Sequence, residues 1–130
     1  MARSLPVVKH FTDVFQGAGW ESGTLTAKDG AGAVINLTGA TVRMHVRDEL
    51  GVGALYFEPT YAVISAAAGT FKFSLTGLQL SRNSAWSVTR PDGRRGVLLY
   101  DIEVEVGGVE YRTHQGEFVI GAEATIEQET

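Results

Sequence analysis

Cysteine is absent from this chain of 130 residues, and its absence removes several kinds of chemistry at once. Without a thiol there is no disulfide, no thiolate zinc site and no cysteine nucleophile. Long hydrophobic runs are also missing, since no segment approaches the roughly 18–20 apolar residues that span a membrane. The opening residues MARSLPVVKH lack the apolar stretch and cleavage site of a secretion signal. We therefore expect a chain that is made in a reducing cytoplasm and has no membrane partner.

Positive charge is scarce as well, with 11 Lys and Arg against 15 Asp and Glu and a net charge of −4. Neutralising phosphates requires clustered Lys and Arg, so this balance argues against a nucleic-acid partner. The remaining composition, 44% hydrophobic and 20% charged, is that of a globular protein. The length predicts one domain over residues 1–130, with an extended N-terminal segment (1–15) and a C-terminal tail (126–130).

Glycine, by contrast, is abundant, and its 16 residues separate short runs rich in Val, Ile, Thr, Tyr and Phe. This punctuation is typical of an all-β protein, and it predicts an antiparallel β-sandwich of immunoglobulin-like or jelly-roll-like form. The predicted strands are Val7–Phe15, Gly23–Lys28, Ala40–Asp48, Leu55–Glu58, Ala62–Ser65, Thr70–Leu75, Val97–Val106, Val109–His114 and Gly116–Ile126.

Two local signals add detail to this pattern. Gly107 and Gly108 can both adopt positive φ, which predicts a two-residue hairpin turn between the strands on either side. The stretch SLTGLQLSRNSA has Leu75 and Leu78 among polar residues, enough for one short helical turn near residues 76–84. An irregular crossover fits the same residues equally well.

Two of the predicted strands have charged stripes of opposite sign. In ATVRMHVRD, a strand period of two places a cationic stripe opposite the apolar face: Arg43, His45 and Arg47. In YDIEVEV, the same period produces an anionic stripe: Asp101, Glu103 and Glu105. If the strands are neighbours, the stripes pair within one molecule; if they lie on opposite sheets, each is available to a neighbouring copy. Both alternatives stay open, as does a plainly solvated face.

No constellation of residues points to catalysis. Carboxylates of the anionic stripe lie about 6.5–7 Å apart along the strand, a spacing that permits a glycosidase pair or a calcium site. A flat strand, however, supplies neither the cleft nor the further ligands. His10, His45 and His114 match no metal or triad spacing, and no G-x-S-x-G elbow occurs. We therefore predict a protein that is not an enzyme and has no metal or cofactor.

The stretch NSAWSVTRPDGRRGV contains a strong turn signal at Pro-Asp-Gly. Around it gather the residue types that are most enriched at binding hot spots: Trp86, Arg90, Arg94 and Arg95. Two interpretations are open for this arginine loop. It is either a solvated turn with Trp86 covering the edge of the core, or a contact loop that docks on another chain.

Taken in order, the motifs resemble a family. VFQGAGW, LTAKDGAGAVINLTGATVRMHVRD, GTFKFSLTG and YDIEVEVGGVEYRTHQGEFVIGAEAT follow one another between Val7 and Thr125. This order resembles the small β-sandwich proteins and N-terminal domains of bacteriophage tails and baseplates, including the upper baseplate protein type. One departure is RPDGRRG before YDIEV, where the turn in that family is usually tighter.

The resemblance implies a non-enzymatic virion structural protein, made in the host bacterial cytoplasm. It would be a connector of the tail, baseplate or neck that forms a homo-oligomeric ring and contacts other virion structural proteins. Both stripes and the arginine loop would then be protein contacts, and Met1–Phe15 and the C-terminal tail would cross between subunits. The alternative is a carbohydrate- or host-surface-binding module, which predicts aromatic residues in one exposed groove; the candidates are Trp20, Tyr61 and Trp86.

Overall fold

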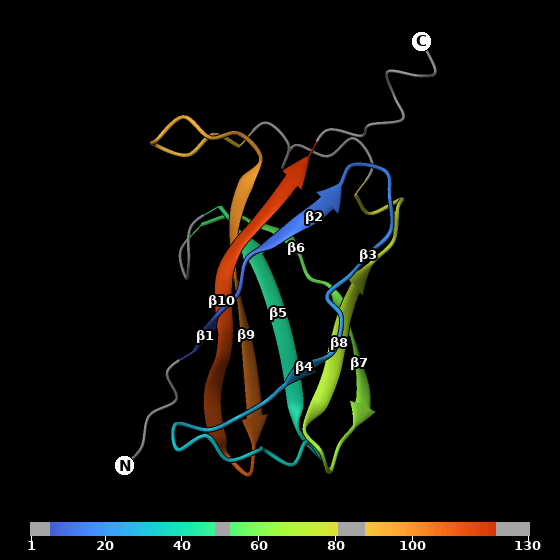
Figure 1. Cartoon of the computed structure of the whole chain (residues 1–130), viewed down its shortest axis with the longest axis vertical. Helices are drawn as coiled ribbons and strands as arrows, with labels where there is room; N and C mark the ends of the chain where they lie inside the picture. The colour runs from blue at the N-terminus through green and yellow to red at the C-terminus, as the bar shows by residue number, and fades with distance from the viewer. Residues whose placement is uncertain (1–5, 49–52, 81–87, 122–130) are drawn as a thin grey trace.

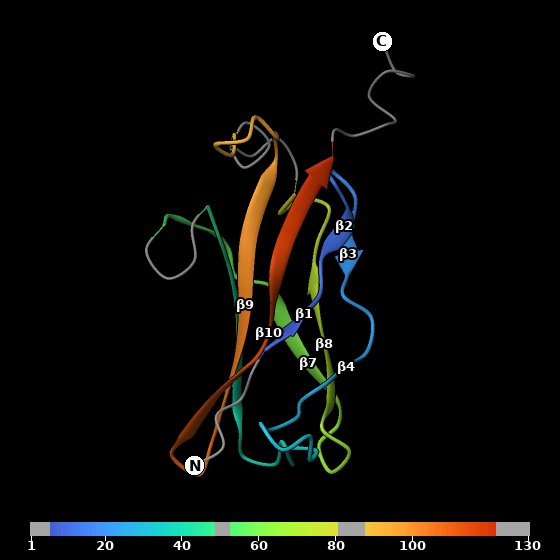
Figure 2. The same ribbon diagram turned by 60° about the vertical axis from the view of Figure 1, so that its left-hand side comes forward.

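Two β-sheets packed face to face form the part of the chain that the computed structural model describes, residues 6–48, 53–80 and 88–121 (Figure 1). Figure 2 shows the two layers after a turn about the long axis. The described residues contain no helix, so the predicted all-β sandwich is confirmed. Most strand pairs are antiparallel, as expected, but two parallel pairs occur at the N-terminus.

Sheet A has six strands. They are β1 (Val7–Val8), β2 (Phe11–Phe15), β5 (Thr41–Arg47), β6 (Leu55–Phe57), β9 (Val97–Val106) and β10 (Val109–Gly121). Their order is β1–β10–β9–β5–β6, and β2 also pairs with β10. The charged stripes lie on β5 and β9, and these two strands are direct neighbours in this sheet.

Sheet B has four strands. They are β3 (Trp20–Glu21), β4 (Leu25–Thr26), β7 (Thr60–Ser65) and β8 (Thr70–Leu75). Strands β3 and β4 pair with opposite ends of β8, while β7 pairs with β8 along its length. The two-residue strand β3 was not predicted, because two residues leave no periodicity to detect.

The N-terminal segment was predicted as one strand, Val7–Phe15, and the structure divides it into β1 and β2. The break lies beside Gly116 of β10, against which the backbone of Lys9 packs. A Cβ atom at Gly116 would overlap the carbonyl oxygen of Lys9. Gly116 therefore lets the N-terminal segment approach β10 closely at this point.

Several hydrogen bonds hold the N-terminal segment in place between β1 and β2. The backbone N–H of Lys9 donates to the carbonyl of Gln115 at 3.0 Å, and the Tyr100 hydroxyl donates to the Lys9 carbonyl at 2.6 Å. One residue further on, the N–H of Glu117 donates to Nδ1 of His10 at 3.0 Å. A side chain thus takes the place of a backbone acceptor where the ladder is interrupted.

The C-terminal hairpin follows the predicted turn, since Gly107 and Gly108 have φ values of 58° and 78°. Beyond the turn the prediction was wrong in one respect. Val109–His114 and Gly116–Ile126 are not two strands, because β10 continues from Val109 to Gly121 with a register shift between Arg112 and His114. A bulge keeps the strand paired with β9 while it bends, and residues 122–126 lie outside the described part.

The predicted helical turn near residues 76–84 is only partly described. The Leu80 N–H donates to the Thr76 carbonyl at 3.2 Å, and Thr76 and Gln79 exchange two side chain–backbone hydrogen bonds. This reciprocal arrangement is the one found at helix N-termini. Residues 81–84 lie outside the described part of the chain.

The core lies between the two sheets and is rich in aromatic side chains. Phe118 of β10 contacts Phe11, Trp20 and Phe57 at ring-centroid distances between 5.0 and 6.4 Å. The largest fully buried side chains come from both sheets: Tyr100, Phe71, Phe73, Phe118 and Met44. The apolar faces that alternate with the charged stripes point into this core, as their period predicts.

Candidate functional site

The two charged stripes meet on the outer face of sheet A. Strands β5 and β9 are antiparallel, and their register places Arg43 directly opposite Glu103 and His45 directly opposite Asp101. We call this surface the ionic face and include the charged residues that join it from β6, β10 and their ends: Glu58, Glu110 and Arg112. Of the alternatives left open by the sequence, pairing within one molecule is the arrangement observed.

Arg43 lies at the centre of the ionic face. Its Nη2 atom is 3.7 Å from Oε1 of Glu103 on β9 and 3.5 Å from Oε2 of Glu110 on β10. One cation therefore links carboxylates from two neighbouring strands. Opposite charges that face each other across strands stabilise the pairing by roughly 0.2–1 kcal/mol per pair, so their main effect is on register.

Asp101 is the least exposed carboxylate of the ionic face, with 14% of its side chain accessible. Loss of solvation raises its pKa, and the positive charge of Arg112, whose Nε is 3.3 Å away, opposes that shift. Beside it, Nε2 of His45 lies 3.5 Å from a carboxylate oxygen of Glu58. Protonation of His45 would turn that contact into an ion pair.

The two ends of the stripes differ. Nη1 of Arg47 donates to the carbonyl of Gly53 at 3.0 Å, so this guanidinium supports a loop. Glu105, at the other end, lies opposite Thr41 on β5 and Glu110 on β10. Among the described residues Glu105 has no ion pair, and like charges opposite each other weaken a strand pair. Glu105 is thus the carboxylate of this face that the described chain leaves uncompensated.

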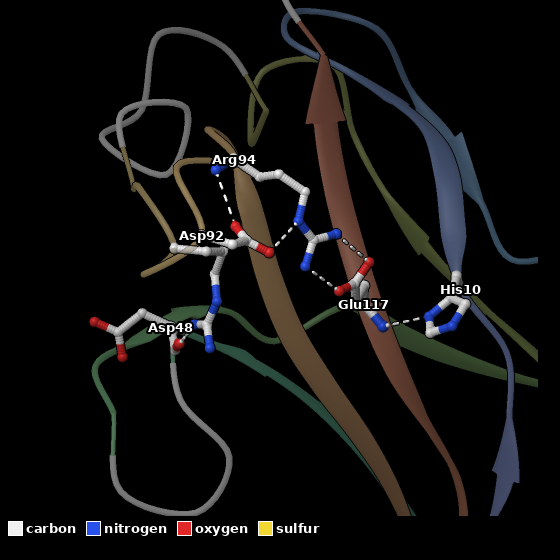
Figure 3. A network of polar contacts seen from close by, with 6 residues as sticks. His10, Asp48, Asp92, Arg94 and Glu117 are labelled. Atoms are coloured by element: carbon white, nitrogen blue, oxygen red, sulfur yellow. Dashed lines mark hydrogen bonds and ion pairs between the residues drawn. The ribbon is translucent and has the colours of Figure 1, made fainter.

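The arginine loop joins the sandwich at Thr89 and Arg95, which form an isolated β-bridge. Figure 3 shows Arg94 between two carboxylates. Its guanidinium donates two parallel hydrogen bonds to Glu117 of β10, at 3.0 and 2.8 Å, and Nε donates to Asp92 at 2.8 Å. Paired hydrogen bonds of this kind fix the orientation of the side chain.

These contacts change the protonation behaviour of the groups involved. Hydrogen bonds to Glu117 and Asp92 raise the pKa of Arg94. The same contact lowers the pKa of Glu117, and the backbone N–H and side chain of Arg94 lower the pKa of Asp92. All three groups therefore keep their charges through the neutral and mildly acidic range.

The second arginine of the loop is also engaged. Arg90 donates to the carbonyl oxygen of Asp48, at the end of β5 (Figure 3). The loop is thus connected to two other parts of sheet A, which favours a fixed turn over a loop that swings. Arg95 belongs to the bridge that closes the loop, and Trp86 lies outside the described residues. That the loop docks on another chain stays a prediction.

Sequence reasoning did not identify His10 or Glu117 as members of this network. Glu117 was part of a predicted strand, and nothing near it in sequence signals a partner 23 residues away. His10 was treated only as a candidate catalytic residue, whereas its ring accepts the N–H of Glu117. Asp92 carried a local signal, because an Asp in a Pro-Asp-Gly turn commonly accepts nearby backbone N–H groups.

Two residues that the sequence analysis weighed for functional roles, Trp20 and His114, are buried. Trp20, a candidate for an exposed aromatic groove, is 4% exposed and packs edge-on against Phe11 and Phe118. His114 is also 4% exposed, lies within 2.9 Å of the Thr113 hydroxyl and contacts the ring of Phe71. Burial, with a smaller contribution from Lys9, lowers the pKa of His114 to about 4.

Comparison with known proteins did not identify a family. No family model matches the sequence, and no curated protein resembles it significantly. Within the described residues, no group of three or more His, Asp or Glu side chains could hold a metal ion. The described part of the chain also contains no helix that is long and apolar enough to cross a membrane.

Proposed function

We propose that the chain is a non-enzymatic structural protein of a bacteriophage virion. It would be a connector module of the tail, baseplate or neck that assembles with itself and with neighbouring virion proteins. One observation supports this most: the motifs that resemble phage tail proteins, INLTGATVRMHVR, YDIEV and GEFVI, fall largely on β5, β9 and β10. These are three adjacent strands of one sheet, so these three motifs of the resemblance lie side by side in space.

The ionic face suits a protein contact. Its charges are held at fixed positions by strand register, and a fixed pattern of both signs favours one partner and one orientation over others. Glu105, which has no ion pair among the described residues, offers a charge that a basic group of a neighbour could compensate. The proposed partners are other copies of the chain and other virion structural proteins.

A glycan-binding role has less support. Of its three aromatic candidates, Trp20 is inside the core, and Tyr61 packs against Phe71 and Phe73 at 6.0 and 5.8 Å. The third, Trp86, lies outside the described residues. The two described candidates, Trp20 and Tyr61, thus favour a packing role, and we do not propose this function.

The direct test is to purify particles of the phage whose genome encodes the chain and to separate tails from heads. Quantitative mass spectrometry should find the chain with the tail or neck fraction, at a constant copy number per particle. A cytosolic host protein serves as the contamination control. The proposal is wrong if the chain is abundant in the lysate but depleted from particles like that control.

A variant tests the role of the ionic face. We expect Glu105→Lys to lower incorporation into particles severalfold, because a neighbour's basic group would then be repelled. The matched control is Thr24→Lys, which places the same cation at an exposed position outside both the ionic face and the N-terminal segment. Equal incorporation of both variants would remove the ionic face from the assembly contact.

A further inference from the structure

Strand β7 is the longest edge strand in the described part of the sandwich. It pairs with β8 on one side, and no described strand pairs with its other side. Figure 1 shows β7 at the right-hand boundary of sheet B, with no strand beyond it. A free edge presents backbone N–H and C=O groups to which another strand can hydrogen-bond.

The side chains of β7 do not protect this edge. The strand reads TYAVIS and contains no charged residue, whereas free edges are commonly protected by Lys or other charges. Val63 and Ile64 are each 51% exposed. The ladder with β8 is regular from Thr60 to Val63 and shifts only between Val63 and Ser65, so a regular template precedes the irregularity.

We propose that β7 pairs antiparallel with β7 of a second copy of the chain across a two-fold axis. The two copies of sheet B would then form one continuous sheet. This inference deepens the self-assembly included in the proposed function and rests on it in that respect. A two-fold axis between antiparallel strands requires one residue to face its own copy, and the geometry points to Ala62.

The choice of Ala62 follows from the side chains on either side of it. With Ala62 at the axis, Tyr61 of each copy faces Val63 of the other. Tyr61 packs against Phe71 and Phe73, and Val63 lies opposite Phe71 in the ladder, so both point toward the core side of the sheet. Aromatic and β-branched residues form favourable cross-strand pairs, and two such pairs would cover the exposed part of Val63.

Charge also permits this pairing. Lys72 of β8 lies opposite Ala62, and it is the cation nearest to the axis along the strand register. Across the joined sheet the two Lys72 residues would be three strand spacings apart, roughly 14 Å, which exceeds the screening length of about 8 Å in physiological salt. Each Lys72 also has Glu21 at 3.3 Å. A second copy therefore brings no unscreened like charge to the interface.

The contact is small, so association should be weak and dependent on concentration. In sedimentation equilibrium, the average mass should rise from 13.9 kDa toward twice that value as concentration increases. Ala62→Glu should abolish the rise, because two carboxylates would face each other at the axis. Within one copy the new carboxylate would face Lys72, so folding should be preserved. The matched control Ala31→Glu, in an exposed turn, should associate like the unmodified chain.

Register can be tested directly because the chain has no cysteine. Ala62→Cys should give a disulfide-linked dimer on mild oxidation, whereas Ala31→Cys should remain mostly monomeric under the same conditions. The inference is overturned if the unmodified chain stays at 13.9 kDa throughout, or if Ala62→Glu associates normally. A monomer that is nevertheless found in purified particles would overturn the β7 contact and leave the proposed function standing. A chain that dimerises through β7 but is missing from particles would support the β7 contact and overturn the proposed function.

Discussion

Gly116 is the residue on which the path of the N-terminal segment depends most directly. Its missing side chain makes room for the Lys9 carbonyl. We expect Gly116→Ala to lower the free energy of unfolding by about 1–3 kcal/mol, because the added methyl group must displace the backbone of Lys9. Urea unfolding measures the loss.

Gly19→Ala is the matched control for that substitution. A Cβ atom there would meet its nearest neighbour, the Leu75 carbonyl oxygen, at an ordinary 3.7 Å. Neither Gly19 nor Gly116 has a positive φ, so the comparison isolates crowding from backbone strain. Equal losses from the two substitutions would mean that the close approach of Lys9 to Gly116 is not what makes Gly116→Ala destabilising.

His114 couples stability to pH. Its pKa is about 4 in the folded chain and about 6.5 when unfolded, so the unfolded state binds the extra proton first as pH falls. The stabilisation is complete above pH 6.5 and is lost progressively toward pH 4, by about 3 kcal/mol in all. His114→Gln should flatten this part of the curve of unfolding free energy against pH.

The control for His114 is His45→Gln, at a side chain on the ionic face. Acidic groups such as Glu117 also titrate below neutral pH, but they are common to both variants. The difference between the curve of His114→Gln and that of the unmodified chain therefore reports His114, and His45→Gln shows the effect of removing an imidazole that is not buried. A curve for His114→Gln as steep as that for His45→Gln would rule out the buried imidazole as the cause.

At the residue scale, the sequence predicted the side on which each stripe residue lies, because a period of two is a local property. It could not predict that Trp20 is buried. Strand β3 has only two residues, and the rings that cover Trp20 come from β2 and β10. The partnership of Arg94 and Glu117 was inaccessible for the same reason, since it depends on how distant elements pack.

At the scale of elements, β5 and β9 are held together by apolar side chains on the core side of the sheet and by charged side chains on its outer side. Arg43→Glu should destabilise the chain by about 1 kcal/mol, because it places a third carboxylate beside Glu103 and Glu110. The double variant Arg43→Glu with Glu103→Arg should regain part of that loss. Thermal unfolding at low salt measures both.

Salt supplies the control for this exchange. The ionic face is solvent-accessible, so the difference between single and double variants should shrink in 1 M salt, where the screening length is about 3 Å. A difference that does not change with salt would mean that packing, and not charge, separates the two variants.

The boundaries of elements were predicted well where both ends have turn chemistry and poorly elsewhere. β8 and β9 match their predicted ranges, since glycine or polar turns bound them. β10 was predicted as two strands because Gly116 reads as a break in the sequence, whereas in the structure it marks a close backbone approach. The parallel pairing of β1 and of β2 with β10 left no local signal in the sequence, since parallel and antiparallel strands share the same period.

At the scale of the whole molecule, the aromatic core ties the two sheets into one unit. Phe118 touches rings from β2, β3 and β6, so residues of both sheets share its environment. We expect Phe118→Ala to cost about 3–5 kcal/mol and to lower the unfolding midpoints of both sheets together.

The measurement uses a Trp86→Phe background, in which fluorescence reports Trp20 alone. Trp20 lies in sheet B and contacts sheet A, so its emission should change at the same denaturant concentration as the far-ultraviolet circular dichroism. Two separate transitions would mean that the sheets unfold independently.

Strand β10, the last strand in the described part of the chain, is also the partner of β1, β2 and β9. During synthesis, residues 7–15 leave the ribosome long before residues 114–121, with which they pair. A nascent chain that ends before Val109 therefore has unpaired N-terminal strands and an uncovered side of β9. Completion of this sheet must wait until β10 has been translated, and until then the growing chain is at its most vulnerable to aggregation.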